Sequence, residues 1–328
     1  MWLKATSAWK QQNVTTVSRP IKGSLDMTYK LLSYEASHGV VAGVLVDGQV
    51  YEAEKALGDA CYRSMLGILD NWRIVRPKLA SFAEHPSGEG VPVVGLKLAA
   101  PITRPPTIYC AGANYRDHVA NMAKVQNLEL DLDPQASGQK PWHFIKSSAC
   151  VVATGATVQA NSNKLDWEAE LALVVGVRAR GLTLDNALSC IAAITNANDF
   201  SARDYLQREQ QDFRSPFKYD WIGHKNFDGS CPLGPWLTPL DEIEDIQDLP
   251  IRLWVNDVLR QDSTTANMMF TAAEQLVHLS SRLTLHPGDV ILTGTPAGTG
   301  AEVGEFLKSG DVVRMQIGEL GELVNTVE

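Results

Sequence analysis

Short runs of apolar residues, separated by glycine, proline and polar residues, recur along the chain and predict more strands than helices. Around Asp47-Gly48, apolar and polar residues alternate over positions 31–54, which is typical of a β-hairpin. Further strands are predicted at residues 107–110, 142–145, 171–177, 191–195, 251–255 and 290–293. Helical spacing of apolar residues predicts helices within residues 60–82, 183–189 and 271–281.

The strands do not alternate regularly with helices, which argues against a doubly wound parallel sheet. We therefore predict an α+β fold that is predominantly β. The prolines Pro101, Pro105 and Pro106 indicate a stiff connector. It divides the chain into a small N-terminal α+β domain, residues 1–104, and a larger C-terminal domain, residues 105–328. The polar residues 1–25 receive no assignment.

Carboxylates are concentrated at the start of the apolar run 171–176. Glu168 and Glu170 are two residues apart, so they point to the same side of a strand, and Asp166 is expected on that side too. Such a pattern is also typical of a strand with one solvated face. The apolar run argues against that interpretation, because carboxylates beside a buried strand are costly unless they are paired or bind a metal.

A third carboxylate, Asp199, follows the predicted strand 191–195, where a strand is expected to pass into a helix. An aspartate in this position can be a helix N-cap, or it can belong to a site at the end of the strand. Glu168, Glu170 and Asp199, without cysteine or histidine at ligand spacing, would form an all-oxygen site. Such a site favours Mg²⁺, Mn²⁺ or Ca²⁺ over zinc.

Composition narrows the class of protein. A net charge of −9 over 328 residues, without a basic run, argues against nucleic-acid binding. The sequence has no stretch of about 18 apolar residues and its N-terminus has no apolar signal region, so we expect a cytoplasmic protein with no membrane segment. The five scattered cysteines indicate reduced thiols and no structural zinc. Glycine-rich nucleotide loops and the nucleophile elbow of serine hydrolases are missing.

From residue 106 to the C-terminus the chain resembles the fumarylacetoacetate hydrolase superfamily, because six motifs occur in the order typical of that family. They are Gly112-Ala113-Asn114-Tyr115-Arg116-Asp117-His118, Phe144-Ile145-Lys146, Glu168-Ala169-Glu170-Leu171, Asn198-Asp199-Phe200-Ser201-Ala202-Arg203-Asp204, Gly223-His224-Lys225-Asn226-Phe227-Asp228-Gly229, and residues 285–300 with Gly294-Thr295-Pro296. The resemblance implies a mixed β-roll or sandwich with a few flanking helices, three metal ligands at Glu168, Glu170 and Asp199, and a homodimer.

The resemblance also implies roles for residues that would otherwise be interpreted as structural. His118 is expected to activate water as a general base, although a single histidine is often structural. Lys225 is expected to polarise a substrate oxygen and Arg203 to contact the substrate or brace the site, although each could be a surface cation. The substrate-binding residues implied by the motifs are Thr295, which would hold a substrate carboxylate, and Lys146, Gly294 and Tyr115.

Two positions depart from the pattern of the family. Hydrolytic relatives often have glutamate three residues after the histidine, where this chain has Asn121. An asparagine can orient an imidazole but cannot stabilise imidazolium as a carboxylate does, so a glutamate from elsewhere would have to serve. Relatives often have glutamine seven residues after the aspartate, where this chain has Leu206.

We therefore expect a metal-dependent hydrolase that cleaves a C–C bond in a 2,4-dioxo acid, such as fumarylpyruvate or another acylpyruvate, through a pyruvate enolate. Aromatic-compound catabolism would be its setting. The same enolate serves isomerases, decarboxylases and dehydratases, so these reactions stay open as alternatives. A non-enzymatic domain that only binds a cation is a further alternative. Residues 119–139 and 208–221 are expected to set specificity for the distal half of the substrate.

Overall fold

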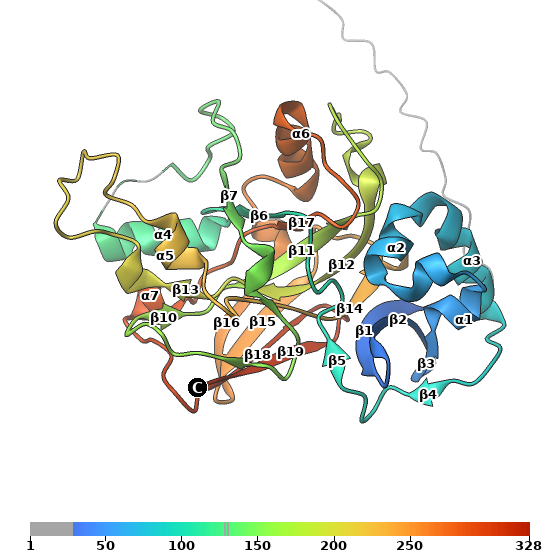
Figure 1. Ribbon diagram of the computed structural model, residues 1–328. Coiled ribbons are helices and arrows are strands. Elements are labelled where there is room, and N and C mark those ends of the chain that lie inside the picture. The colour runs from blue at the N-terminus through green and yellow to red at the C-terminus, as the bar shows by residue number, and fades with distance from the viewer. Residues whose placement is uncertain (1–28, 128, 130) are drawn as a thin grey trace, which may run out of the picture.

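The computed structural model describes residues 29–127, 129 and 131–328 (Figure 1). Residues 1–25, which received no assignment, lie outside this range. The first described strands, β1 (Lys30–Ala36), β2 (Gly39–Val46) and β3 (Gln49–Glu52), form an antiparallel meander. Asp47 and Gly48 join β2 to β3 with φ angles of 48° and 76°, as a tight hairpin turn requires. The predicted hairpin is confirmed.

Helices follow this hairpin as predicted. They are α1 (Ala53–Leu57), η1 (Ala60–Arg63), α2 (Met65–Asp70) and α3 (Trp72–Glu84), and Figure 1 shows them beside β1–β3. The short strands β4 (Val91–Pro92) and β5 (Leu98–Ala99) pair with β3 and β1. Because β1 also pairs with β14, the N-terminal strands continue into the main sheet. The domain boundary at residue 105 stays a prediction.

The main sheet has β11 near its centre, and its path is β4-β3-β2-β1-β14-β12-β11-β17-β6-β7. Its remaining strands are β6 (Ile108–Ala111), β7 (His143–Lys146), β8 (Val151–Val152), β11 (Ala169–Val175), β12 (Ile191–Asn198), β14 (Cys231–Pro239) and β17 (Val290–Leu292). Every residue of β11 is buried, as the uninterrupted apolar run predicted.

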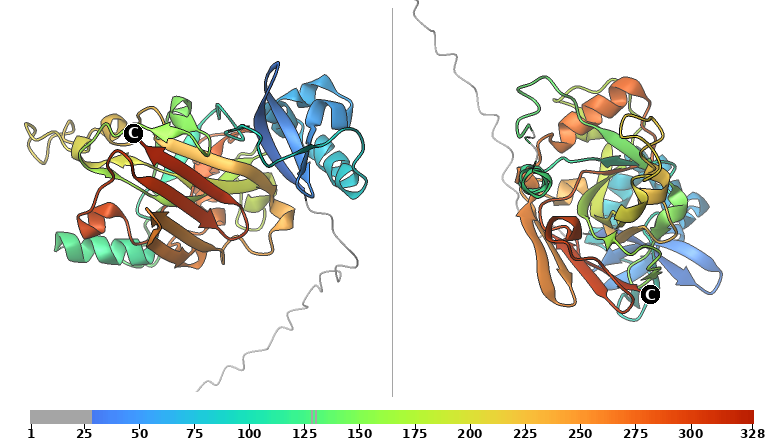
Figure 2. Two further views of the ribbon diagram at one scale, coloured as in Figure 1. Left: turned by 90° about the horizontal axis from the view of Figure 1, so that it is seen from below. Right: turned by 90° about the vertical axis from the view of Figure 1, so that its left-hand side faces the viewer.

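A second sheet, in the order β16-β15-β18-β19-β9, packs against one face of the first. Its strands are β9 (Thr157–Val158), β15 (Pro250–Val255), β16 (Val258–Thr264), β18 (Val312–Ile317) and β19 (Glu322–Val327). Leu171 of β11 shares a buried core with Leu253 and Met315 of the second sheet. Figure 2 shows this sheet as a separate layer. The fold is thus the predicted strand-dominated α+β arrangement, with two packed sheets.

The remaining elements are short apart from α4 and α6. They are α4 (Arg116–Gln126), η2 (Ser148–Cys150), β10 (Leu165–Asp166), η3 (Ala187–Cys190), β13 (Ser201–Ala202), η4 (Arg203–Tyr205), α5 (Trp221–Lys225), η5 (Leu240–Glu242), η6 (Thr265–Asn267), α6 (Ala272–Arg282) and α7 (Gly300–Val303). Thr271 and Glu274 form a capping box at the start of α6. This helix confirms the prediction for residues 271–281.

The predicted helix at residues 183–189 is wrong. The chain makes a turn there and then the 3₁₀ helix η3. The Asn186 side chain accepts a hydrogen bond from the Thr183 N–H at 2.8 Å, and the Ser280 hydroxyl accepts one from the Leu182 N–H at 3.0 Å. These side chains satisfy backbone donors without an α-helix, which is how asparagine and serine compete with helical hydrogen bonding.

The cysteines agree with the expectation of reduced thiols. All five cysteines are free thiols, and Cys61 alone among them is exposed. In the described part of the chain, no helix has the length and apolar character needed to cross a membrane.

His143 carries a prediction about stability at low pH. Burial, followed by His278 of α6, lowers the pKa of His143 to about 4, and its ring stacks on His278 with centroids 6.0 Å apart. A lowered histidine pKa contributes stability above about pH 6.5 that is lost as the pH falls towards 4, here up to about 3 kcal/mol. We expect His143→Phe to lose less unfolding free energy between pH 7 and 5 than the wild type, measured by urea denaturation. His85→Phe, at an exposed position, is the control; equal pH dependence in all three proteins would contradict the prediction.

Candidate active site

Three buried carboxylates meet at one end of the β11–β12 pair. Asp199 follows the last residue of β12, Glu170 is the second residue of β11, and Glu168 precedes that strand. The antiparallel register pairs Ala169 with Asn198, and the Asp199 N–H donates to the Glu168 carbonyl at 2.9 Å. One oxygen from each carboxylate lies within 4.8 Å of the others. The structure therefore brings together the three residues predicted as metal ligands.

Two buried lysines balance part of this negative charge. Lys225 Nζ lies 2.7 Å from Glu168 Oε2 and 2.6 Å from Asp199 Oδ2. Lys146 Nζ lies 2.5 Å from Asp199 Oδ1 and donates to the Phe200 carbonyl at 3.2 Å. Both ammonium groups are buried, so neither is a surface cation. Asp199 holds both lysines, and its side chain is not a helix N-cap.

The electrostatics of the carboxylates differ in a way that suits a divalent cation. Burial, then the charges of Asp199 and Glu168, raises the pKa of Glu170 well above its usual value. Burial would also raise the pKa of Glu168, but Lys225 and Arg203 outweigh it and lower that pKa. A cation between the three groups would keep all of them ionised. The donor set fits a hard ion that prefers oxygen ligands.

Asp166 does not belong to this group, contrary to the expectation from strand alternation. The chain is irregular at Trp167 and Glu168, between β10 and β11, so the two-residue period breaks there. Asp166 instead accepts hydrogen bonds from the N–H groups of Gly300, at 2.6 Å, and Ala301, at 3.0 Å.

Arg203 bridges Asp166 to the carboxylate group. Its Nε lies 2.9 Å from Asp166 Oδ2, and its guanidinium lies 2.5 Å from Glu168 Oε1. It begins the 3₁₀ helix η4, after the short strand β13, so the α-helix expected directly after Asp199 is absent. Arg203 therefore holds one oxygen of Glu168, while Lys225 holds the other.

His118 lies in the first turns of α4 and pairs with a glutamate that the sequence motifs did not identify. Its Nδ1 is 2.5 Å from Glu302 Oε1, and Asn121 Nδ2 donates to Glu302 Oε2 at 2.9 Å. Glu302 also accepts from the Gly298 N–H at 3.0 Å. Burial would raise the pKa of Glu302, but its hydrogen bonds, led by that of His118, lower it. Glu302 is thus a carboxylate from elsewhere in the chain beside His118, as the presence of Asn121 at the expected position required.

The sequence signal for Glu302 was ambiguous. Glu302 follows Thr299 with the Ser/Thr-x-x-Glu spacing of a helix capping box. Thr299 is indeed the N-cap residue of α7, and its hydroxyl lies 3.3 Å from Glu302 Oε1. Glu302 lies beside His118 because α7 packs against α4.

The predicted substrate-binding residues occupy different positions relative to the carboxylates. The Gly294 N–H donates to Glu170 Oε2 at 2.6 Å. The Thr295 hydroxyl donates to the Ala169 carbonyl at 2.9 Å and accepts from Gln261 at 2.9 Å. Tyr115 is fully buried, and its hydroxyl has no hydrogen-bond partner within the described residues. Gly294 and Thr295 thus hold the turn next to the carboxylates.

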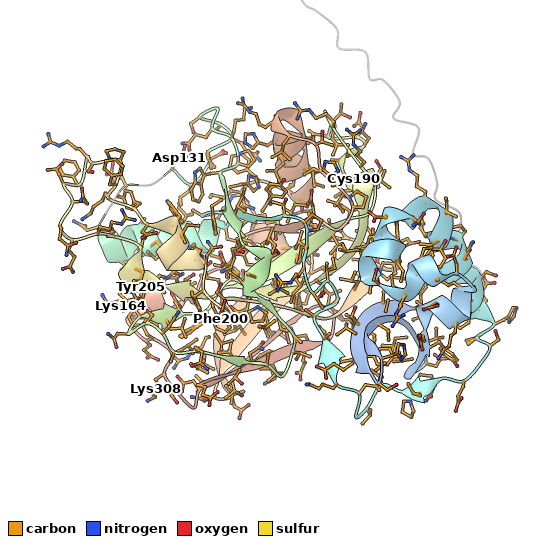
Figure 3. All side chains as sticks on the ribbon, viewed as in Figure 1. Asp131, Lys164, Cys190, Phe200, Tyr205 and Lys308 are labelled. Carbon is orange, nitrogen blue, oxygen red and sulfur yellow. The ribbon has the colours of Figure 1, made fainter. Side chains whose placement is uncertain are left out.

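A cavity of about 530 Å³ opens beside His118. Figure 3 shows Asp131, one of the residues that line it, in the loop between α4 and β7, away from the N-terminal strands. The cavity is lined by Gly112, Ala113, His118, Val119, Met122, Asp131, Pro134, Gln139, Lys140, Trp142, Met269 and Phe270. The segment 119–139, which was expected to set specificity, contributes several of these residues.

Comparison with known proteins identifies the family. Residues 107–328 match the model described as "Fumarylacetoacetate (FAA) hydrolase C-terminal", so the chain belongs to the fumarylacetoacetate hydrolase family. "Oxaloacetate tautomerase fahd2, mitochondrial" from Xenopus laevis is 38% identical over 236 residues, which cover 71% of this chain and 68% of that protein. "Fumarylacetoacetate hydrolase domain-containing protein 2 homolog" from Dictyostelium discoideum is 31% identical over 320 residues, 91% of this chain and 97% of that one.

A solved structure agrees with this assignment. The fumarylacetoacetate hydrolase from Exiguobacterium antarcticum superposes with a TM-score of 0.73 at 27% identity, covering 92% of this chain and 99% of that chain. The family resemblance predicted from the motifs is confirmed, and the chain belongs to a superfamily of enzymes. The relatives include tautomerases as well as hydrolases, so the predicted hydrolysis stays a prediction. Since the Xenopus laevis relative is named as mitochondrial, the cytoplasmic location stays a prediction too.

Proposed function

We propose that this protein is a divalent-metal-dependent enzyme that interconverts the keto and enol forms of a 2-oxo acid, with oxaloacetate as the first substrate to test. One observation carries the proposal: His118, oriented by the buried Glu302, is close enough to the three carboxylates for its charge to contribute, after Lys225 and Arg203, to the lowered pKa of Glu168. The named activity of the Xenopus laevis relative supports the choice of substrate. The binding-only alternative would leave the His118–Glu302 pair without a role.

Glu168, Glu170 and Asp199 would hold the ion, and the predicted candidates Mg²⁺, Mn²⁺ and Ca²⁺ all suit these ligands. When bound, the ion would act as a Lewis acid that withdraws electron density from the 2-oxo group and makes C3 of the substrate more acidic. Lys225, which already contacts two of the ligands, would supply a positive charge close to the substrate oxygen that becomes negative.

His118 is the residue placed to move the proton. Its Nδ1 faces the ionised Glu302, so Nδ1 carries a hydrogen and Nε2 keeps a free electron pair for the substrate. Nε2 would accept a proton from C3 as the C2=C3 double bond forms, and the imidazolium would then give that proton to the enolate oxygen, directly or through water. The reverse transfers give the keto form. Glu302 acts through His118 by holding the ring and balancing the charge of the imidazolium.

The function is tested by following the decay of enolic oxaloacetate by ultraviolet absorbance, with the protein and Mn²⁺ or Mg²⁺. We expect acceleration over the spontaneous reaction that disappears on addition of EDTA and returns with excess metal. No acceleration by metal-loaded protein would contradict the proposal.

Hydrolysis of an acylpyruvate or of fumarylpyruvate is the second candidate. The completed His118–Glu302 pair favours it, because the same nitrogen could deprotonate water for attack at C4. The test is incubation of the protein and Mn²⁺ with acetylpyruvate in ¹⁸O-water, followed by mass spectrometry. Labelled acetate together with pyruvate would establish hydrolysis; unlabelled products would exclude it for this substrate. A homodimer and a place in aromatic catabolism stay predictions.

Glu302→Gln tests the orienting role of that glutamate. The amide oxygen can still accept the Nδ1–H bond, but the group carries no charge, so the imidazolium formed during proton transfer is less stable. We expect turnover to fall about 10- to 100-fold with metal affinity unchanged. Glu305→Gln, an exposed glutamate three residues away, is the control. Wild-type turnover in Glu302→Gln would mean that the contact is structural.

A further inference from the structure

The cavity beside His118 is larger and less polar than a four-carbon dicarboxylic acid requires. Its volume of about 530 Å³ lies within the range typical of sites for ligands of drug size. We infer that the preferred 2-oxo acid carries an aromatic or branched aliphatic group beyond C3, bound between α4 and the segment around Phe270. This inference rests on the proposed function, because it assumes that the 2-oxo acid end lies at the three carboxylates.

One wall of the cavity is a rigid apolar surface. Val119, Met269 and Phe270 form a buried hydrophobic cluster of their own. Asn114 connects this cluster to the segment beside the carboxylates. Its side chain accepts a hydrogen bond from the Phe270 N–H at 2.9 Å and donates one to the Thr293 carbonyl at 2.8 Å. Thr293 directly precedes Gly294, which contacts Glu170. The apolar wall is therefore held in fixed relation to the carboxylates.

The indole of Trp142 forms another part of the lining. It packs so closely on Gly112 that a Cβ at that position would lie 2.2 Å from the ring. It also contacts the ring of Trp221, with centroids 4.9 Å apart, and that of Phe144, at 5.7 Å. Although Trp142 is 48% exposed, these contacts fix its orientation. An aromatic substituent that packs against Trp142 would gain stacking in addition to burial.

Two charged side chains, Asp131 and Lys140, lie at the mouth of the cavity. Asp131 accepts hydrogen bonds from Ser137, from Gln139 and from the Asp133 N–H. Lys140 is exposed, and its charge acts on His278 of α6, where it adds to burial and Arg282 in lowering that pKa. Lys140 is a cation of the lining, but it is exposed at the mouth, where water and salt screen its attraction for a second carboxylate.

Hydrogen bonds of Gln135 hold the mouth of the cavity in place. Gln135 donates to the Met269 carbonyl at 2.7 Å and to both carboxylate oxygens of Glu274 at 2.9 Å. Glu274 is the capping-box residue of α6. The loop that carries Asp131 is thereby tied to the same segment as Phe270, so the cavity keeps its size without a ligand.

The test compares two inert analogues by isothermal titration of the full chain loaded with Mn²⁺. N-phenyloxamate and N-oxalylglycine share the carboxylate and adjacent carbonyl of a 2-oxo acid, and differ in an apolar or a charged substituent. We expect N-phenyloxamate to bind at least tenfold more tightly. Equal affinities, or tighter binding of N-oxalylglycine, would overturn the inference.

Two variants on α4 locate the substituent. Met122 lines the cavity, so Met122→Phe should lower the affinity for N-phenyloxamate at least tenfold more than that for N-oxalylglycine. Val125→Phe, one turn away at a position 55% exposed and outside the lining, should leave the ratio of the two affinities unchanged. An unchanged ratio in Met122→Phe would also overturn the inference. These titrations measure binding without turnover. If the proposed reaction were wrong, the protein would not accelerate the decay of enolic oxaloacetate, but the expected ratio of the two analogue affinities would still be observed.

Discussion

Replacing either glutamate of the β11 site should abolish metal binding, but the two substitutions should have opposite effects on the metal-free protein. Glu168→Gln removes one of the two carboxylate partners of Lys225 and of Arg203, both of which lie 2.7 Å or less from its oxygens. Removing every partner of a buried charge typically costs about 3–5 kcal/mol, but Lys225 keeps Asp199 and Arg203 keeps Asp166. We therefore expect Glu168→Gln to lower the free energy of unfolding by less than that, about 1–3 kcal/mol.

Glu170→Gln removes a carboxyl group that burial and two neighbouring carboxylates make costly to ionise. The amide oxygen of glutamine can still accept the Gly294 N–H. We expect this variant to be as stable as the wild type without metal, or more stable by about 1–2 kcal/mol, because the unfavourable burial of a carboxylate is relieved.

Urea denaturation in EDTA measures the stabilities, and isothermal titration with Mn²⁺ and Mg²⁺ measures the affinities. Glu84→Gln, at an exposed position in α3, controls for the loss of one charge. Retained metal affinity in both site variants would refute the metal assignment. If Glu168→Gln and Glu170→Gln were equally destabilised, the two glutamates would not differ as proposed. In that proposal Glu168 pairs with Lys225 and Arg203, whereas the charge of Glu170 is balanced only when a metal is bound.

The sequence predicted the centre of the fold and the three carboxylates because both depend on short-range patterns. The apolar run after Glu170 predicted a strand buried on both faces, and β11 is such a strand. Asp199 follows the next predicted strand, and the structure pairs the two strands antiparallel, which brings the carboxylates together. The six motifs then specified the family, which composition and periodicity alone do not.

Other parts of the site depended on contacts between distant segments, which no local pattern encodes. Glu302 reaches His118 across 184 positions, and its local spacing indicated only a helix cap. Asp166 does not lie with the other carboxylates because the alternation of side chains along the strand is interrupted at Trp167. No residue type at that position predicts the interruption. The ion pair between Lys146 and Asp199 joins residues 53 positions apart. Tertiary packing decides such contacts, so the structure was needed to find them.

The largest effect on catalysis is expected from His118→Asn. The asparagine can still hydrogen-bond Glu302, but it cannot accept a proton at the position of Nε2. We expect turnover of oxaloacetate to fall by about 10²–10⁴, as is typical when a general base is removed, with affinity for Mn²⁺ unchanged because His118 is not one of the three carboxylate ligands. The measurements are the rate of decay of the enol and isothermal titration with the metal.

The double variant His118→Asn, Glu302→Gln separates a positioning role for Glu302 from an independent one. If Glu302 acts through the imidazole, its substitution should cost nothing further once His118 is absent, so the effects of the two substitutions should not add. Costs that multiply would mean that Glu302 acts on the substrate by a route of its own. Turnover at the wild-type rate in His118→Asn would assign the proton transfer to another group and leave His118 a structural role at the start of α4.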